Sequence, residues 1–351
     1  MSVIKALVQW RGVGLKKKAD ETSSAGYAGM MEISGGYSED MHVGKGNTPV
    51  GQVNSTAAFY RLQPVDLFTE HTICESLARE DSPYMIAISK PRAYGEIVGD
   101  LLYDNCPVNG KGRICEIGGG YGNLMKGLLN RYAEDICHVC MVDLSINLLK
   151  RQRGVLKQWK NKISFVNGNA HTIIPTLSGI DFFIINEVIG DLDTWTDLDA
   201  RCLPEAIEKR VLRYGLTIPR EGTFHINMGA ICLVEDICQS GACAFISEHS
   251  CDPIIPEGMA YLTRDLSCDG YPREIRLKDH SEYTIRFEHL IKTAVWWGKR
   301  VITGSLIDLV GLEKTPRMRS IFVGRMGGSD TREIIYELLD HIREYRWMLI
   351  L

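Results

Sequence analysis

The sequence has no long hydrophobic run and no surplus of positive charge. No apolar stretch reaches the roughly 18 residues that a membrane-spanning helix needs. Lysine and arginine number 40 against 44 aspartates and glutamates, so the formal net charge is −4. A nucleic-acid-binding protein usually carries a basic surface, and this composition gives no sign of one. We therefore expect neither a membrane nor a nucleic acid as a partner.

The amino terminus does not have the composition of a targeting segment. A secretory signal needs about 7–15 continuous apolar residues before a small-residue cleavage site, and a transit peptide is poor in acids. Here three lysines follow a short apolar stretch, and Asp20, Glu21 and Glu32 come early. These features predict a cytoplasmic protein.

Cysteine lacks the density of a disulfide-rich protein, with 11 residues in a chain of 351. The odd number and the position of Cys115 and Cys243 in apolar, strand-like runs favour free, buried thiols. Cys137 and Cys140 have the spacing of a zinc half-site, but no second such pair exists. Residues i and i+3 of a strand also point to opposite faces. We expect no metal site.

Four parts can be distinguished along the chain. Residues 1–57 are an irregular, glycine-rich arm, and residues 58–109 form a helical segment. Residues 110–329 alternate between strands and helices, with an inserted helical segment at about 190–240. Residues 330–351 have helical periodicity and end in the apolar run WMLIL, which predicts a C-terminal helix.

The alternating pattern predicts an α/β fold. The expected strands are Arg113–Ile117, His138–Leu144, Ile163–Val166, Asp181–Ile185 and Ala242–Ser247, with later strands at Tyr283–Phe287, Arg300–Leu306 and Met318–Gly324. Helices are expected at Gly122–Tyr132 and Asn147–Trp159. Strands joined by helices imply right-handed crossovers, so we expect a doubly wound, mostly parallel sheet.

A glycine-rich loop, EIGGGYG, ends the first of these strands and begins the next helix. Its spacing is G-x-G-x-G, because Asn123 stands where a dinucleotide-binding loop has its last glycine. It is not a P-loop, since no Gly-Lys-Ser/Thr follows. Glu116 precedes the first glycine by two positions and would repel a diphosphate. A carboxylate at this place suits a cationic ligand with an amino group.

Polar residues at the ends of the next two strands narrow the ligand further. Asp143 lies 21 residues after Gly122, where an acid can accept hydrogen bonds from both ribose hydroxyls. Asn169 follows the third strand, where a side-chain amide can meet an adenine edge. An adenosine ligand with a positive charge in place of phosphates is S-adenosylmethionine.

On these residues, the sequence resembles the class I S-adenosylmethionine-dependent methyltransferases over about 110–250. The resemblance implies a seven-stranded Rossmann-like sheet that ends in an antiparallel hairpin, here from Arg300–Leu306 and Met318–Gly324. It also implies S-adenosyl-L-methionine as the cofactor. The residues that would hold it are Glu116, Gly118, Gly119, Gly120, Gly122, Asp143, Leu144 and Asn169.

The fourth strand ends in the polar pair Asn186-Glu187, and the carboxyl ends of parallel strands face the ligand crevice. One interpretation places both residues at the catalytic centre, beside the transferred methyl and its acceptor. The other is that they cap or turn the following segment.

The pieces EIGGGYGNLM, IINEVIGDL and EYTIRFEHL together make the chain similar to a narrower group, the MidA-like methyltransferases. Known members include mitochondrial proteins that methylate arginine on a respiratory-complex subunit. This sequence departs from the group's pattern at Val188-Ile189-Gly190 and in the long segment 195–235.

The methyl acceptor stays open between a nitrogen, with protein arginine as one example, and a hydroxyl. A guanidinium would be bound by Glu187, whereas a hydroxyl would need a base such as His225 or His249. Two alternative functions for the chain are those of a small-molecule O- or N-methyltransferase and of an assembly factor that binds the cofactor without turnover. The apolar tail Trp347–Leu351 either packs on its own core or forms the contact of a homodimer.

Overall fold

The computed structural model describes residues 51–63, 67, 72–106, 110–267, 269–325 and 329–351. The chain divides into two units, Met1–Thr48 and Pro49–Leu351, and every described residue belongs to the second. Most of the predicted glycine-rich arm therefore lies outside the described residues. No helix of the described part is long and apolar enough to cross a membrane.

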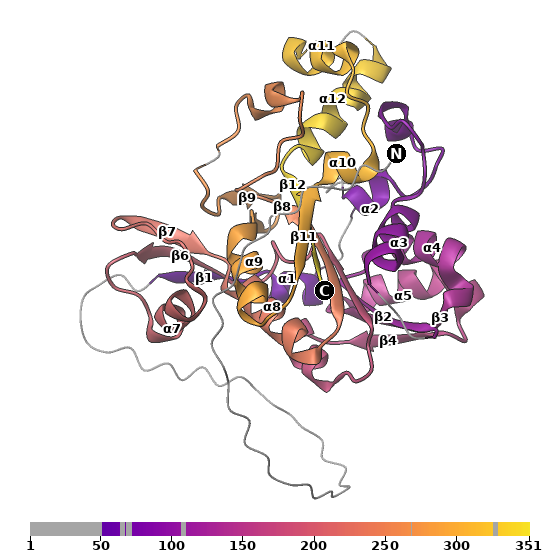
Figure 1. Cartoon of the computed structure of the whole chain (residues 1–351). Coiled ribbons are helices and arrows are strands. Elements are labelled where there is room, and N and C mark those ends of the chain that lie inside the picture. Colours follow the sequence, from indigo (N-terminus) through magenta and orange to yellow (C-terminus); the bar gives the residue numbers. More distant parts are fainter. Residues whose placement is uncertain (1–50, 64–66, 68–71, 107–109, 268, 326–328) are drawn as a thin grey trace, which may run out of the picture. The chain divides into compact units, whose positions relative to one another are not determined.

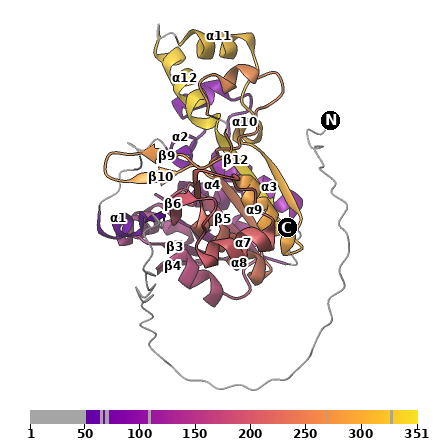
Figure 2. The same ribbon diagram turned by 90° about the vertical axis from the view of Figure 1, so that its left-hand side faces the viewer.

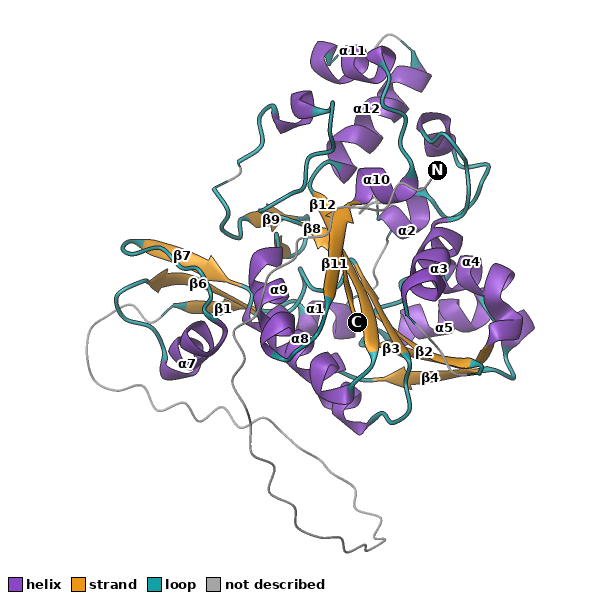
Figure 3. Cartoon of the chain, viewed as in Figure 1, coloured by secondary structure: helices purple, strands orange, loops and turns teal. Residues whose placement is uncertain are grey.

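A seven-stranded sheet forms the centre of the second unit, with strand order β11-β12-β8-β5-β2-β3-β4 (Figures 1 and 3). Its strands are β2 (Gly112–Ile117), β3 (Ile136–Asp143), β4 (Ile163–Asn167), β5 (Phe182–Asn186), β8 (Cys243–His249), β11 (Val301–Ser305) and β12 (Tyr345–Ile350). The pairs from β4 to β8 are parallel. Strand β12 runs antiparallel to both of its neighbours. The predicted doubly wound, mostly parallel sheet is confirmed.

Helices cover both faces of this sheet. They are α1 (Ala57–Leu62), α2 (Ile73–Ser76), α3 (Tyr94–Asn105), α4 (Asn123–Tyr132), α5 (Ile146–Val155), α6 (Ala170–Ile173), α7 (Glu205–Tyr214), α8 (Met228–Ser240), α9 (Phe287–Trp296), α10 (Leu306–Val310), α11 (Pro316–Gly324) and α12 (Asp330–Ile342). Short 3-10 turns lie at Pro83–Ala87, Ala133–Asp135, Lys157–Trp159, Ile174–Thr176 and Ala260–Thr263.

Alternate residues of each strand point into two separate cores. On β5, Phe182 and Ile184 pack with α3, α4 and α10–α12, whereas Phe183 and Ile185 pack with α7, α8 and α9. All four side chains are buried, because helices cover both faces of the strand. This explains why the sequence of β5 is continuously apolar and does not alternate.

Cys137 and Cys140 lie on β3, where Cys137 is exposed and Cys140 is buried. Their side chains do not converge, as the strand geometry predicts.

The C-terminal segment corrects one prediction. Residues 330–351 are not a single helix, because α12 ends at Ile342 and Tyr345–Ile350 form strand β12 inside the central sheet. Met348, Leu349 and Ile350 are fully buried. A short, continuous apolar run fits a buried strand and a buried helix equally well, so periodicity alone could not separate them. The exposed tail that suggested a homodimer is therefore absent, and a homodimer stays a prediction without that support.

The predicted final hairpin is also wrong. Strand β11 pairs with β12 and not with Met318–Gly324, which lies in helix α11. Thr315 caps this helix through its hydroxyl, and Pro316 occupies the first turn, a common helix start. Nor is Tyr283–Phe287 a strand of the central sheet. Tyr283 ends β10 (Ser281–Tyr283), and Phe287 begins α9.

The insertion at about 190–240 is only partly helical. It contains β6 (Thr194–Asp199), α7 and β7 (Thr223–Ile226), and with β1 (Gln52–Asn54) its strands make a small antiparallel sheet in the order β1-β6-β7. Helix α8 then leads back into β8 of the central sheet. Strands β9 (Glu274–Arg276) and β10 form a separate two-stranded hairpin. Figure 2 shows this hairpin and α1 on the same side of the unit, in agreement with the contact between Phe59 and His280.

Candidate active site

A cavity of about 430 Å³ lies at the carboxyl ends of the parallel strands. Ends of β3 and β4 contribute Asp143 and Asn169 to its wall, and those of β5 and β8 contribute Glu187 and Glu248. The sheet order puts β4, β3 and β2 on one side and β5, β8 and β12 on the other. Five of the eight residues predicted to hold a cofactor thus line one half of the cavity, and a group of carboxylates lines the other; the five are Gly118, Gly120, Asp143, Leu144 and Asn169.

The glycine loop forms the turn between β2 and α4. Gly118 and Gly120 have φ angles of 64° and 51°, which L side chains rarely adopt, and both line the cavity. A Cβ atom at Gly118 would also lie 2.4 Å from Val188. Gly119 and Gly122 shape the loop, since the N–H of Gly122 donates to the Gly119 carbonyl, but they are not part of the cavity wall.

Glu116 is a buried carboxylate without enough hydrogen-bond partners. Its residue is 2% exposed, and among the described residues Oε2 has no partner. Burial, together with the charge of Asp143, raises the pKa of Glu116 to about 8. A buried acceptor that lacks a donor is costly, and an ammonium group would satisfy it. This chemistry fits the amino group of the predicted cofactor, although Glu116 lies behind the cavity wall.

Asp143 is held rigidly at the end of β3. Its Oδ1 accepts the N–H of Ser145 at 2.8 Å, and its Oδ2 accepts the Nε2 of Gln152 at 3.0 Å. The same Gln152 amide donates to the carbonyl of Gly120, which ties the aspartate to the glycine loop. Burial raises the pKa of Asp143 to about 6. Each carboxylate oxygen keeps a lone pair for a further donor such as a hydroxyl.

Leu144 and Asn169 also line the cavity. Asn169 is the N-cap of α6, and its Oδ1 accepts the N–H of His171 at 2.9 Å. The side-chain oxygen is therefore used within the protein, and only the amide NH₂ is left to meet a ring nitrogen of an adenine. Leu144 adds apolar surface beside it. The set of residues fits the predicted adenosine cofactor.

Glu187 is both at the cavity and a cap, so the two sequence interpretations are not exclusive. Its Oε1 accepts the N–H of Ile73 and the hydroxyl of Tyr345, at 2.8 and 2.7 Å. Its Oε2 accepts Nδ2 of Asn186 at 2.9 Å and the N–H of Cys74 at 3.3 Å. Burial raises the pKa of Glu187 to about 7. The carboxylate thus orders the first turn of α2, which precedes it by more than a hundred residues.

Sequence analysis missed four further carboxylates at the cavity wall. They are Asp191, Asp193, Glu248 and Glu282. Glu248 is 4% exposed, and its oxygens accept the N–H groups of Gly190 and His249. Burial and the charge of Glu282 raise the pKa of Glu248 to about 8. Its position at the end of β8, equivalent to that of Glu187 on β5, is the signal that could have identified it.

The two predicted bases differ in position. His249 lines the cavity and packs against the ring of Tyr345, with centroids 4.0 Å apart. Burial lowers its pKa to about 4, so it is neutral at pH 7. His225 lies on β7, where its Nδ1 accepts the N–H of Asp197, and it is not part of the cavity wall.

We expect Asp143→Ala to weaken cofactor binding at least tenfold while the fold persists. Up to two charge-assisted hydrogen bonds would be lost, each worth roughly 1.5–3 kcal/mol. Calorimetry with S-adenosylhomocysteine measures the change. Asp199→Ala is the matched control, because Asp199 pairs with Arg201 away from the cavity. Unchanged affinity of the Asp143 variant would contradict the ribose assignment.

The buried carboxyls predict a ligand-free protein that loses stability as the pH rises from about 4.5 to 8, most clearly above pH 6.5. Folded Glu116, Glu187 and Glu248 keep protons up to pKa values of about 8, 7 and 8, whereas an unfolded glutamate releases its proton near 4.5. The folded state therefore binds more protons, and its stability falls as the pH rises through this window. His249 and His289 have pKa values lowered to about 4, so they lower the stability of the folded state as the pH falls below 6.5.

The contribution of one carboxyl can be isolated by Glu116→Gln, since glutamine does not titrate. We expect the variant to show a smaller drop in Tm than the unmodified chain between pH 6.5 and 8.5, measured by differential scanning fluorimetry. Equal drops in both proteins would mean that the pKa of Glu116 is not raised.

Comparison with known proteins finds a family model that covers part of this site. A family model described as "Putative S-adenosyl-L-methionine-dependent methyltransferase" matches residues 98–192, which include the glycine loop, Asp143 and the Asn186-Glu187 pair. A comparison with curated proteins finds no match.

Solved structures with a similar fold include a COG1565 superfamily member from Burkholderia thailandensis bound to S-adenosyl-homocysteine. It is 16% identical, with a TM-score of 0.48, and the match covers 80% of this chain and 78% of that one. An O-methyltransferase family protein from the same organism is 11% identical, with a TM-score of 0.39 and coverage of 77% and 57%.

The fold and the cavity together define a doubly wound α/β protein with a cavity at its strand ends whose lining fits the predicted adenosine cofactor. With the family match, the chain is a class I S-adenosylmethionine-dependent methyltransferase, and S-adenosylmethionine is its cofactor. The predictions of class, activity and cofactor are confirmed.

Proposed function

We propose that the protein methylates a positively charged nitrogen, in a guanidinium or ammonium group, and that protein arginine is one such acceptor. The observation that supports this proposal is the charge of the cavity wall. Glu187, Asp191, Glu248 and Glu282 line it, and the described lining residues include neither lysine nor arginine.

An acceptor with a positive charge would compensate this wall. Carboxylates that are partly removed from water favour a nearby cation, because desolvation makes their own unpaired charge costly. Burial raises the pKa values of Glu187 and Glu248 in the ligand-free protein, so a cationic acceptor would favour their ionised forms, whereas a neutral hydroxyl would not. The carboxylates lie on the β5–β8 side, opposite the residues assigned to the cofactor, where an acceptor would have to enter.

Within the wall, Glu248 and Glu187 have different capacities. The four donors around Glu187 use the four lone-pair sites of its carboxylate, so it acts as a positioning residue for α2 and Asn186. Glu248 accepts the N–H groups of Gly190 and His249 and keeps lone pairs for an acceptor N–H. We therefore assign contact with the acceptor nitrogen to Glu248.

The chemistry of the step is a displacement in which the bound cofactor supplies an electrophilic methyl group on its sulfonium. The protein holds the acceptor nitrogen in line and accepts the proton that this nitrogen loses. Burial raises the pKa of Glu248 to about 8 in the ligand-free protein, and a bound cationic acceptor would favour its ionised form, which can then take up that proton. The neutral imidazole of His249 has a pKa of about 4 and is the weaker base.

A transfer assay with radiolabelled S-adenosylmethionine tests the proposal. Acceptors are an arginine peptide, a lysine peptide, free arginine and a catechol, and we expect label on at least one cationic nitrogen and none on the catechol. Glu248→Gln should raise KM for that acceptor at least tenfold with little change in cofactor affinity. Glu257→Gln, at an exposed position outside the cavity, is the control.

Transfer to the catechol alone would contradict the proposal. Tight cofactor binding without transfer to any acceptor in a cell lysate would favour the assembly-factor alternative.

A further inference from the structure

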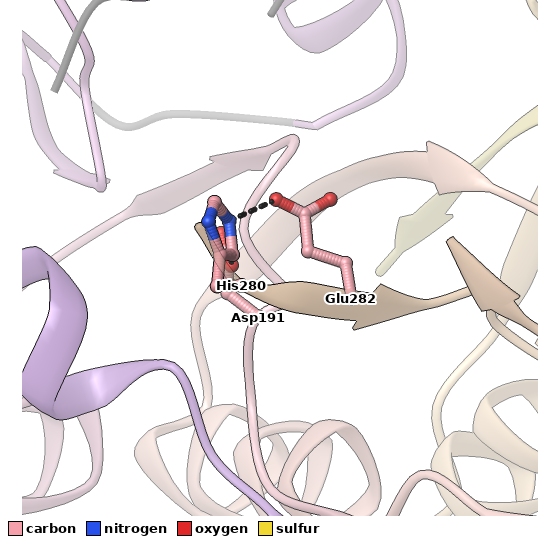
Figure 4. A group of neighbouring side chains, drawn as sticks. All are labelled: Asp191, His280 and Glu282. Carbon is pink, nitrogen blue, oxygen red and sulfur yellow. Dashed lines mark hydrogen bonds and ion pairs between the residues drawn. The ribbon is translucent and has the colours of Figure 1, made fainter. Parts of the chain in front are cut away.

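A cluster of three potential metal ligands lies at the edge of the cavity. Asp191 belongs to the segment that follows β5, and His280 and Glu282 belong to the β9–β10 hairpin. Figure 4 shows the imidazole of His280 turned toward the Glu282 carboxylate, with Asp191 beside it. Of the three, Asp191 and Glu282 line the cavity, whereas His280 stands behind them.

The spacing of the donor atoms suits a single ion. Nε2 of His280 lies 3.1 Å from Oε1 of Glu282 and 4.0 Å from Oδ1 of Asp191. All three ligand atoms lie within 4.8 Å of one another. An ion that is about 2.0–2.2 Å from each nitrogen or oxygen ligand holds neighbouring ligand atoms at separations of this order.

The ligands are largely buried, and one carboxylate oxygen among them has no hydrogen bond within the described part of the chain. The His280 side chain is 7% exposed, and those of Asp191 and Glu282 are 17% and 19% exposed. Among the described residues, the buried Oδ1 of Asp191 has no hydrogen-bond partner. Buried carboxylate oxygens are normally satisfied, so this atom indicates a missing positive group.

The imidazole is already held in the orientation that a metal ligand needs. The ring of Phe59 stacks on it, with centroids 4.1 Å apart and an interplanar angle of 26°. Tyr60 packs against its edge at 5.5 Å. Such packing keeps Nε2 directed at the two carboxylates and lowers the entropy lost when an ion binds.

We propose that Asp191, His280 and Glu282 bind one divalent transition-metal ion, with Zn²⁺ as the best fit. Imidazole nitrogen favours zinc and similar ions over Mg²⁺ and Ca²⁺, which prefer oxygen ligands only. Three protein ligands leave at least one coordination position for water. The ion would compensate the charge of Asp191 and Glu282 and leave Glu248 for the acceptor.

The ion would join three segments that are distant in sequence. Thr56, before α1, donates through its hydroxyl to the Asp191 carbonyl at 2.9 Å. The N–H of Tyr283 donates to the carbonyl of Gly190 at 3.2 Å. A metal ion at this point would fasten the hairpin and α1 to the segment after β5, and so fix the outer wall of the cavity. The proposal does not depend on which acceptor is methylated.

Metal binding by the full chain tests the proposal. After treatment with a chelator, we expect calorimetry to show one Zn²⁺ per chain, and Co²⁺ to give visible absorption typical of nitrogen and oxygen ligands. His280→Ala should weaken Zn²⁺ binding roughly a hundredfold or more, and Glu282→Gln at least tenfold. His138→Ala is the control, because His138 lies on β3 away from the cavity.

Zn²⁺ should also raise the Tm of the unmodified chain and not that of the His280 variant. Three results would overturn the proposal: no Zn²⁺ binding by the unmodified chain at millimolar concentration, equal affinity for Mg²⁺, or full Zn²⁺ affinity in both ligand variants. The last result would place the ion at other carboxylates of the cavity. Circular dichroism of each variant verifies that it is folded, and Glu282→Gln provides the second test if His280→Ala does not fold.

Discussion

An aspartate in place of Met348 should prevent the chain from folding at room temperature. Met348 is fully buried on β12, between β11 and β8, and it packs in the core formed with α7, α8 and α9. The substitution would remove apolar surface and bury an unpaired charge, a combination that costs more than about 4 kcal/mol. Domains are stable by only about 5–15 kcal/mol, so most of the folded population should be lost. Circular dichroism and the yield of soluble protein measure the effect.

Leu212→Asp provides the matched control, since Leu212 is 75% exposed on α7 and the charge would reach water. Deletion of Trp347–Leu351 should have the same consequence as Met348→Asp, because it removes the residues that join β11 to β8. A truncated chain that stays folded with unchanged cofactor affinity would contradict the position of β12.

Replacing Glu187 with glutamine should lower kcat by a hundredfold or more, which corresponds to about 2.7 kcal/mol in the barrier. Glutamine has one carbonyl oxygen, so it cannot accept from Ile73, Cys74 and Tyr345 together. The start of α2 and the cavity wall at Cys74 would lose their fixed position, and a negative charge would disappear from the acceptor side. Cofactor affinity should change little, because Asp143 and Glu116 lie on the other half of the site.

Tyr345→Phe is the companion variant, since it removes one donor to Glu187 and keeps the carboxylate charge. If Glu187 positions the wall, Glu187→Asp should restore part of kcat, and the pH profile of kcat should shift in the glutamine variant. An equal loss of cofactor binding would make Glu187 a cofactor ligand. Full activity with an unchanged pH profile would limit its role to capping α2.

Much of the fold and of the cofactor half of the site was predictable from local patterns. The apolar runs at β2, β3, β4, β5 and β8 are bounded by turns and separated by helical periodicity, and each predicted strand lies within two residues of the observed bounds. The EIGGGYG loop and Asp143 follow directly from the strands that carry them. Such signals are local, because one strand, one turn and one helix contain all the residues needed.

The acceptor half could not be predicted in the same way. Glu187 is held by α2 and β12, which are more than a hundred residues away on either side of it. Glu248 and His249 become neighbours of Glu187 only because β8 pairs with β5. Asp191 and His280 are separated by nearly ninety residues and meet only when the β9–β10 hairpin folds against the segment after β5.

The sequence alone determined the class of the protein, because strand–glycine-loop–helix geometry and a strand-end acid are encoded within short segments. Tertiary structure decided the fate of the apolar terminus, which became β12 at the interior of the sheet. The pattern of a short, continuous apolar segment is compatible with a helix and with a buried strand. This segment becomes a strand because it pairs with the edges of β8 and β11. Tertiary structure also decided the charge of the cavity wall, because the wall combines carboxylates from β5, β8 and β10 and the segments that follow them.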